Sequence, residues 1–155
     1  MKPLVPPIQP AKVGKDVLDL DYLLNAPYED ISEAAENIPA AIGWLGYNRS
    51  MAIERMILSE QAWKKVEATQ YFELKHGGFT SQGFGDKPTE EALKKAVLLT
   101  DQVDEACQDY AKRRQQVEWF TSQIDALKSK LELVRSSEAT RRMEHEPDKN
   151  RNTVI

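Results

Sequence analysis

An almost unbroken heptad pattern of apolar residues runs through residues 90–142. One row recurs every seven residues and consists of Ala96, Val103, Tyr110, Val117, Ile124 and Leu131. A second row follows three positions later and consists of Leu99, Ala106, Arg113, Phe120, Leu127 and Val134. Apolar residues at alternating spacings of three and four form a seam along one side of a helix. The pattern therefore predicts one long helix over about 90–142, which would measure roughly 80 Å.

A second heptad pattern predicts a helix over about 39–75. Its apolar positions alternate at spacings of four and three, and two polar residues fill the gaps: Ile38, Ile42, Leu45, Arg49, Ala52, Met56, Ser59, Trp63 and Val66. Gly77 and Gly78 should end this helix, because glycine favours helix C-termini. Thr89 is a suitable N-cap for the long helix. Strand signals are absent, so we predict an all-α fold, an elongated helical hairpin.

The rest of the chain divides into an N-terminal tail, residues 1–28, the helical domain, residues 29–142, and a C-terminal tail, residues 143–155. The N-terminal tail is rich in proline and acidic residues, and the C-terminal tail is polar. Within the first, residues 16–24 mix aspartates with large apolar residues, which predicts a short helix. This helix would either dock on the protein's own core or bind a partner.

The first turns of the helical domain carry two further signals. Asp30 and Glu33 have the spacing of a capping box at a helix N-terminus. Pro39 follows and lacks a backbone donor, so it should interrupt the helix or restart it.

The length of the apolar seam indicates that several copies of the chain assemble. A narrow apolar seam of this length cannot be covered by a short chain that folds once on itself, so we expect partner helices from other copies. The residues expected to be buried partly between chains of a helical homo-oligomer are Tyr110, Val117, Phe120, Ile124, Leu127 and Leu131. The alternative is a compact monomeric hairpin with a frayed end of the long helix.

The composition of the chain disfavours several classes of protein. The chain has 155 residues, 41% of them hydrophobic and 30% charged, and a net charge of −4, which disfavours a strongly basic nucleic-acid binder. The charge is uneven, since residues 1–37 contain 3 basic and 7 acidic residues, and residues 128–155 contain 7 basic and 5 acidic. A single cysteine, Cys107, fits a reducing compartment. No apolar run is long enough to span a membrane, so we expect a cytoplasmic protein.

Enzyme signatures are missing from the sequence. No glycine-rich phosphate loop follows a strand, and His76 and His145 have no cluster of metal-ligating neighbours. We therefore expect no catalysis, no cofactor and no metal ion.

Basic residues form two candidate contacts with nucleic acid. Four of them share one heptad position along the long helix: Arg114, Lys128, Arg135 and Arg142. Lys130 lies on the other flank of the seam. A row of cations could follow a phosphate backbone. Intrahelical ion pairs explain the same row, because Asp125 and Glu132 precede Lys128 and Arg135 by three residues.

The second basic group lies near the tip of the predicted hairpin. It consists of Lys64, Lys65 and Lys75 and is interleaved with the aromatic residues Trp63, Tyr71 and Phe72. Basic residues beside exposed rings are typical of single-stranded nucleic-acid sites, where bases stack on the rings. Trp63 also fits the apolar seam, which leaves Tyr71, Phe72 and Phe79 as candidates for stacking.

Residues from about 40 to 142 resemble the UvsY recombination mediators of T-even phages. The similarity runs in order through Trp44, residues 60–66 (EQAWKKV), the Tyr71-Phe72 pair and residues 89–94 (TEEALK). It is most specific at residues 124–130 (IDALKSK), where the family pattern reads Ala-Leu-Asp-Ala-Ile-Lys-Ser-Arg.

The resemblance implies a small all-α protein that forms a ring-like homo-oligomer. It implies binding to single-stranded DNA, destabilisation of the complex of that DNA with single-strand-binding protein, and loading of the strand-exchange recombinase. The family's basic stretch before the glycine loop corresponds here to residues 66–75, where Lys75 is the one basic residue. DNA contact in this region would therefore depend on Lys64, Lys65 and Lys75.

Two functions follow as hypotheses. The first is a non-enzymatic phage recombination mediator in the host cytoplasm, with Lys128, Lys130 and Arg135 as the main DNA contact. The second is a helical scaffold or adaptor whose heptads join protein partners alone.

Overall fold

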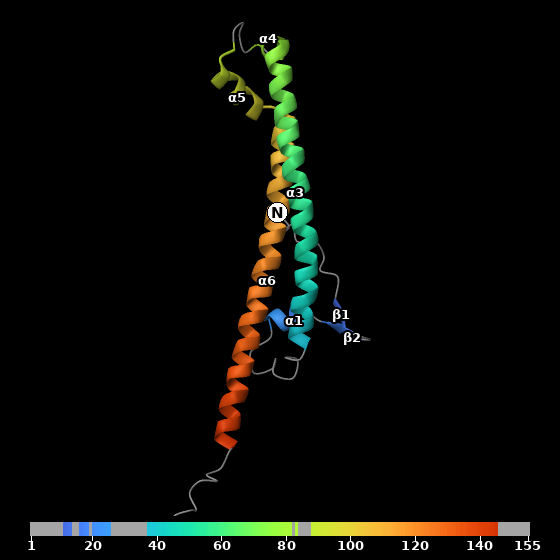
Figure 1. The fold of residues 1–155 in the computed structure, drawn as a ribbon, viewed down its shortest axis with the longest axis vertical. Coiled ribbons are helices and arrows are strands. Elements are labelled where there is room, and N and C mark those ends of the chain that lie inside the picture. The colour runs from blue at the N-terminus through green and yellow to red at the C-terminus, as the bar shows by residue number, and fades with distance from the viewer. Residues whose placement is uncertain are drawn as a thin grey trace, which may run out of the picture. The chain divides into compact units, whose positions relative to one another are not determined.

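The computed structural model describes residues 11–13, 16–18, 20–25, 37–81, 83 and 88–145 (Figure 1). In chain order the elements are β1 (Ala11–Val13), β2 (Asp16–Leu18), α1 (Leu20–Asn25), α3 (Ile38–Glu73), the π-helical turn η2 (Leu74–Gly78), α4 (Phe79–Ser81), α5 (Glu90–Leu98) and α6 (Asp101–His145). The described chain is dominated by helices, which confirms the all-α class. None of the described helices combines the length and the apolar character that crossing a membrane requires.

The chain folds as two compact units, and both long helices contribute to each of them. Of the described residues, those within 48–119 form unit 1, and those within 11–47 and 120–145 form unit 2. Helix α3 leaves unit 2 after Tyr47, and α6 enters unit 2 at Phe120.

Helix α3 matches the predicted helix over 39–75 closely. It begins at Ile38, and Pro39 sits in its first turn, where its missing donor costs no helical hydrogen bond. The helix gives way to η2, in which Gly77 has a positive φ of 116°. A side chain at Gly78 would meet the carbonyl oxygen of Glu73 at 2.9 Å. The two glycines are therefore what allows the chain to leave the helix here. The capping box of Asp30 lies outside the described residues.

The prediction of one uninterrupted helix over 90–142 is wrong, because α5 and α6 are separate helices. Figure 1 shows α5 set at an angle to α6. The Thr100 hydroxyl donates to the carbonyl of Val97 at 2.7 Å, and the Thr100 carbonyl accepts the first amide bonds of α6. The amides of Leu99 and Thr100 bond to the carbonyls three residues back, those of Ala96 and Val97, so α5 ends in a tightened turn. As a consequence Leu99, a seam residue, is 73% exposed.

The core of unit 1 is formed where α3, η2, α5 and α6 meet. Its buried residues are Leu74, Leu93, Ala96, Val97 and Val103. Trp63 of α3 packs against this core and stacks on Tyr110 of α6, with ring centroids 5.6 Å apart. Thr89 caps α5 as predicted, since its hydroxyl accepts from the amide of Ala92 at 3.2 Å.

The core of unit 2 takes residues from α1, α3 and α6. The buried residues are Leu23, Ile38, Ala41, Leu45, Phe120, Ile124, Leu127 and Val134. Helix α1 confirms a short N-terminal helix, but it covers Leu20–Asn25, and the start of the predicted segment, Asp16–Leu18, forms strand β2 instead. The strands β1 and β2 form an antiparallel ribbon in which Lys12 pairs with Val17, so the expectation that the chain contains no strand is wrong for this segment.

Candidate nucleic-acid interface

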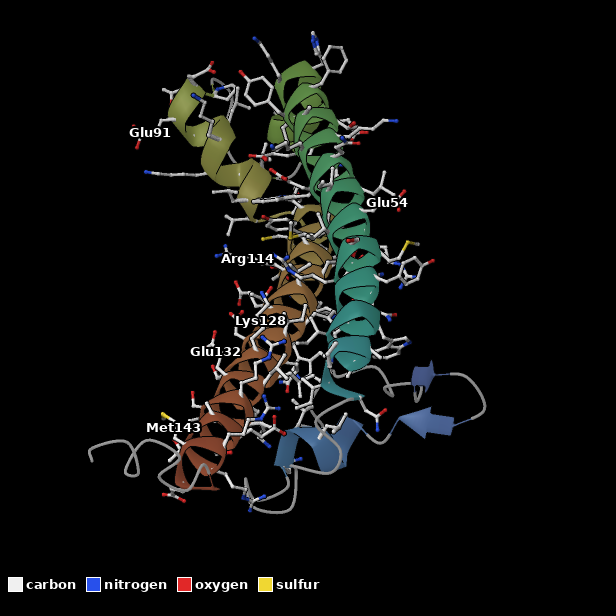
Figure 2. All side chains as sticks on the ribbon, turned by 60° about the horizontal axis from the view of Figure 1, so that its bottom comes forward. Glu54, Glu91, Arg114, Lys128, Glu132 and Met143 are labelled. Carbon is white, nitrogen blue, oxygen red and sulfur yellow. The ribbon has the colours of Figure 1, made fainter. Side chains whose placement is uncertain are left out.

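Three exposed cations follow one line along α6 in unit 2. Lys128, Arg135 and Arg142 are spaced by seven residues, so they lie on one side of the helix at intervals of about 10 Å. The predicted ion pairs of Lys128 with Asp125 and of Arg135 with Glu132 do not form among the described residues. Figure 2 shows Lys128 and Glu132 on the same side of α6. The line therefore combines three positive charges with three exposed carboxylates one helical turn away, those of Asp125, Glu132 and Glu138.

Lys130, the third predicted residue of this region, is engaged inside unit 2. Its ammonium donates to the carbonyls of Leu23, at 2.9 Å, and of Leu24 at the end of α1. Partial burial lowers the pKa of Lys130 because desolvation disfavours the charged form. The last carbonyls of a helix lack intrahelical donors, so a cation satisfies them well. Lys130 thus holds α1 in place, on a different side of α6 from Lys128 and Arg135.

Replacing Lys130 by Met should release α1. Hydrogen bonds from a charged donor contribute about 1.5–3 kcal/mol, and Met keeps the length of the apolar stem while losing the donors. We expect faster amide hydrogen exchange in Leu20–Asn25, measured by mass spectrometry. Lys128→Met is the matched control, because Lys128 is exposed on the same helix. Equal protection of α1 in both variants would contradict the docking role of Lys130.

The second predicted group, in unit 1, is partly neutralised. The Lys64 ammonium lies 2.6 Å from the Glu60 carboxylate, and this hydrogen bond raises the pKa of Lys64. Lys75 lies over the ring of Tyr71, with its ammonium 5.7 Å from the ring centroid. Lys65 is exposed on α3. Of the three lysines, Lys65 therefore has the least compensated charge.

The structure brings Lys64 and Tyr71 together at a groove between α3 and α5. The groove has a volume of about 460 Å³ and is lined by Lys64, Glu67, Ala68, Tyr71, Lys94, Val97 and Leu98. The Tyr71 hydroxyl donates to the carboxylate of Glu90 at 3.0 Å, which fixes its ring. Sequence reasoning missed Lys94, because its place opposite Lys64 depends on the angle that the break after α5 creates.

The aromatic residues divide between core and surface. Trp63 belongs to the core of unit 1, and Tyr71 is half-buried. Phe72 is 63% exposed, and its ring lies 4.2 Å from the His76 ring, centroid to centroid. The side chain of Phe79 lies outside the described residues. Phe72 is therefore the predicted ring that offers most stacking surface in the described part of unit 1.

The residues predicted for the oligomer interface fall into two classes. Phe120, Ile124 and Leu127 are buried within the chain, with 6%, 8% and 0% exposure. Tyr110, Val117 and Leu131 are half-buried, so these three retain surface that a second chain could cover. The interface itself stays a prediction.

The two cationic groups belong to different units, Lys64, Lys65 and Lys75 to unit 1 and Lys128, Lys130 and Arg135 to unit 2. In the described ranges, no group of three or more His, Cys, Asp or Glu side chains is arranged to hold a metal ion.

Comparisons of the chain with protein-family models, with curated proteins and with solved structures found no match. What the described residues offer chemically is a set of exposed cations and two exposed rings, Phe72 in unit 1 and Tyr47 in unit 2.

Proposed function

We propose that this protein is a non-enzymatic recombination mediator. It binds single-stranded DNA and helps a strand-exchange recombinase to replace single-strand-binding protein on that DNA. The observation that carries the proposal is the line of Lys128, Arg135 and Arg142, which are exposed and form no ion pair among the described residues. The resemblance of residues 40–142 to the UvsY mediators supports the same function.

The spacing of these three cations suits a flexible single strand, which carries one negative charge per nucleotide. Phosphate contacts from Lys and Arg carry no sequence information, so binding should be independent of sequence and sensitive to salt. A mediator has to release the strand to the recombinase, and three cations per chain give a correspondingly weak contact. Because the whole chain has a net charge of −4, DNA should bind only where cations gather, at this line on α6.

Assembly supplies the affinity that one chain lacks. In this proposal α3 and α6 form an elongated hairpin, and several copies join into a ring-like homo-oligomer. Tyr110, Val117 and Leu131 provide the half-exposed apolar surface for contacts between chains. A strand that engages several copies at once is held by the effective concentration of the neighbouring sites.

Charge reversal of Lys128 and Arg135 together to Glu should weaken the binding of a labelled oligonucleotide, measured by fluorescence anisotropy at several salt concentrations. Each lost phosphate contact should reduce the slope of log K against log salt by about 0.7, because single strands release fewer counterions than duplexes. We therefore expect the slope to fall by up to about 1.4. Oligomer size should not change, since both side chains are exposed.

The matched control is Lys95→Glu with Lys112→Glu, which changes the net charge by the same amount at exposed positions of unit 1. An equal loss of affinity in this control would show that total charge, rather than the line on α6, determines binding. If Lys64→Glu with Lys65→Glu and Lys75→Glu alone abolished binding, the main site would lie in unit 1.

A helical scaffold or adaptor is the second candidate function. The observation that favours it is the number of large apolar side chains exposed on the described helices, among them Leu98, Leu99 and Leu133. Such residues suit contacts with other proteins. An absence of oligonucleotide binding even at low salt would decide for the scaffold.

A further inference from the structure

One side of α3 in unit 1 carries exposed side chains that the DNA-binding proposal does not use. Met51 and Leu58 are 38% and 58% exposed, and Glu54 and Arg55 between them are also exposed. Ile57, at 44% exposure, borders the group. Figure 2 shows Glu54 on the side of α3 that is turned away from α5. We call Met51, Glu54, Arg55 and Leu58 the α3 outer face.

Helical spacing makes the α3 outer face one continuous surface. Positions 51, 54, 55 and 58 stand in the i, i+3, i+4, i+7 relation, so they line up on one side of the helix. Met51 and Leu58 are two turns apart, about 10 Å, with the two charges between them. Neither Glu54 nor Arg55 forms an ion pair within the described part of the chain, although five i,i+4 pairs form elsewhere on these helices.

The chemistry of this face fits a protein contact better than a nucleic-acid contact. Its net charge is zero, so it offers no net positive charge that could neutralise the phosphates of a nucleic acid. Exposed apolar side chains on one face, here Met51 and Leu58 with Ile57 at its border, are typical of surfaces where another protein binds. The partner should therefore offer apolar side chains at the two ends of the contact and opposite charges at its centre.

A second copy of the same face meets this requirement in one orientation. If two α3 helices pack antiparallel about a two-fold axis between positions 54 and 55, Met51 of each copy faces Leu58 of the other. Glu54 of each copy then faces Arg55 of the other, so every contact is made twice, as two-fold symmetry requires. A parallel arrangement would place Glu54 against Glu54 and Arg55 against Arg55, which is unfavourable. The order apolar, acidic, basic, apolar is thus self-complementary only when the helices are antiparallel.

We propose that the α3 outer face is a homodimer contact in which two copies pair antiparallel about this two-fold axis. The contact deepens the assembly part of the proposed function, and it rests on that part alone. Combined with a contact through α6, it gives each copy two different interfaces, from which larger closed assemblies can be built. Its test contains no DNA, so failure of this contact and failure of DNA binding are read from separate experiments.

Reciprocal charge exchange tests the orientation. We compare the full-length wild type, Glu54→Arg, Arg55→Glu and the double variant by sedimentation equilibrium, with far-UV circular dichroism to monitor folding. Each single variant turns two attractive pairs into two repulsive ones, so we expect the dimer dissociation constant to rise about tenfold or more. The double variant restores unlike charges across the axis and should associate as the wild type does.

The apolar part of the contact has its own pair of variants. Leu58→Ser should weaken association at least as much as the single charge variants. Met143→Ser is the control, because Met143 is also a large apolar residue, lies on α6 and is 71% exposed. A wild type that sediments as a monomer would overturn the proposal and assign the face to a different protein. Association as strong in both single charge variants as in the wild type, or weakened association that the double variant fails to restore, would overturn it as well.

Discussion

Replacing Ile124 and Leu127 together by Asp is expected to unfold unit 2. Both side chains belong to the core that α6 forms in this unit, with 8% and 0% exposure. Truncating a buried Leu or Ile to Ala already costs about 2–5 kcal/mol, and a buried carboxylate adds the cost of its desolvation or protonation. The sum for two sites reaches the whole stability of a typical domain, about 5–15 kcal/mol. Far-UV circular dichroism should show a large loss of helical signal at 25 °C, and the thermal transition should broaden or disappear.

Leu133→Asp provides the matched control for this double variant. Leu133 lies on the same helix and receives the same chemical change, but it is 57% exposed. Substitutions at exposed positions usually change stability by less than about 0.5 kcal/mol, so the melting curve should stay close to that of the wild type. The graded variant Leu127→Ala should fall between the two, with a loss of about 2–5 kcal/mol. Similar melting curves for the double variant and the control would show that the α6 seam does not form the core.

The buried faces of the helices could be predicted because they follow from periodicity alone. The residues at heptad positions of α3 and α6 are buried or half-buried in the described structure, from Ile38 to Val66 and from Val103 to Val134. Periodicity cannot locate the break after α5, because the heptad continues through Leu99 without a change. At the break the amides of Leu99 and Thr100 bond to the carbonyls three residues back, those of Ala96 and Val97. Such bonds have no signature in the spacing of apolar residues.

The candidate site was predictable in its positions and less so in its contacts. Heptad spacing placed Lys128 and Arg135 on one line, and the same helical spacing brings Lys64 to Glu60 at i,i+4, where the pair forms. The i,i+3 pairs with Asp125 and Glu132 do not form in the described structure, because side-chain rotamers and not spacing decide such weak pairs. The role of Lys130 could not be foreseen, since its bonds to Leu23 and Leu24 join segments more than 100 residues apart.

Replacing Trp63 by Ala is expected to cost unit 1 about 3 kcal/mol or more of its free energy of unfolding. The indole packs against the core that includes Leu74, Leu93 and Val97 and stacks on Tyr110 at 5.6 Å, so truncation removes packing against η2, α5 and α6 at once. Losses of about 3–5 kcal/mol are usual for large aromatic residues in cores, and the half-buried state of Trp63 places it towards the lower end. Urea denaturation followed by far-UV circular dichroism measures the change without relying on tryptophan fluorescence.

Two further variants separate the contacts of the buried Trp63 ring from the effect of losing any aromatic side chain on α3. Phe72→Ala removes an aromatic side chain from the same helix that is 63% exposed, so it should cost little stability. Trp63→Phe keeps a ring against Tyr110 and also removes the indole Nε1–H, which is buried without an acceptor among the described residues. A buried donor without a partner costs about 1–3 kcal/mol, and its removal should offset part of the lost packing. Trp63→Phe should therefore lose less than half as much stability as Trp63→Ala. Equal losses in these two variants would show that the indole N–H is satisfied in solution, and equal losses in Trp63→Ala and Phe72→Ala would place Trp63 outside the core.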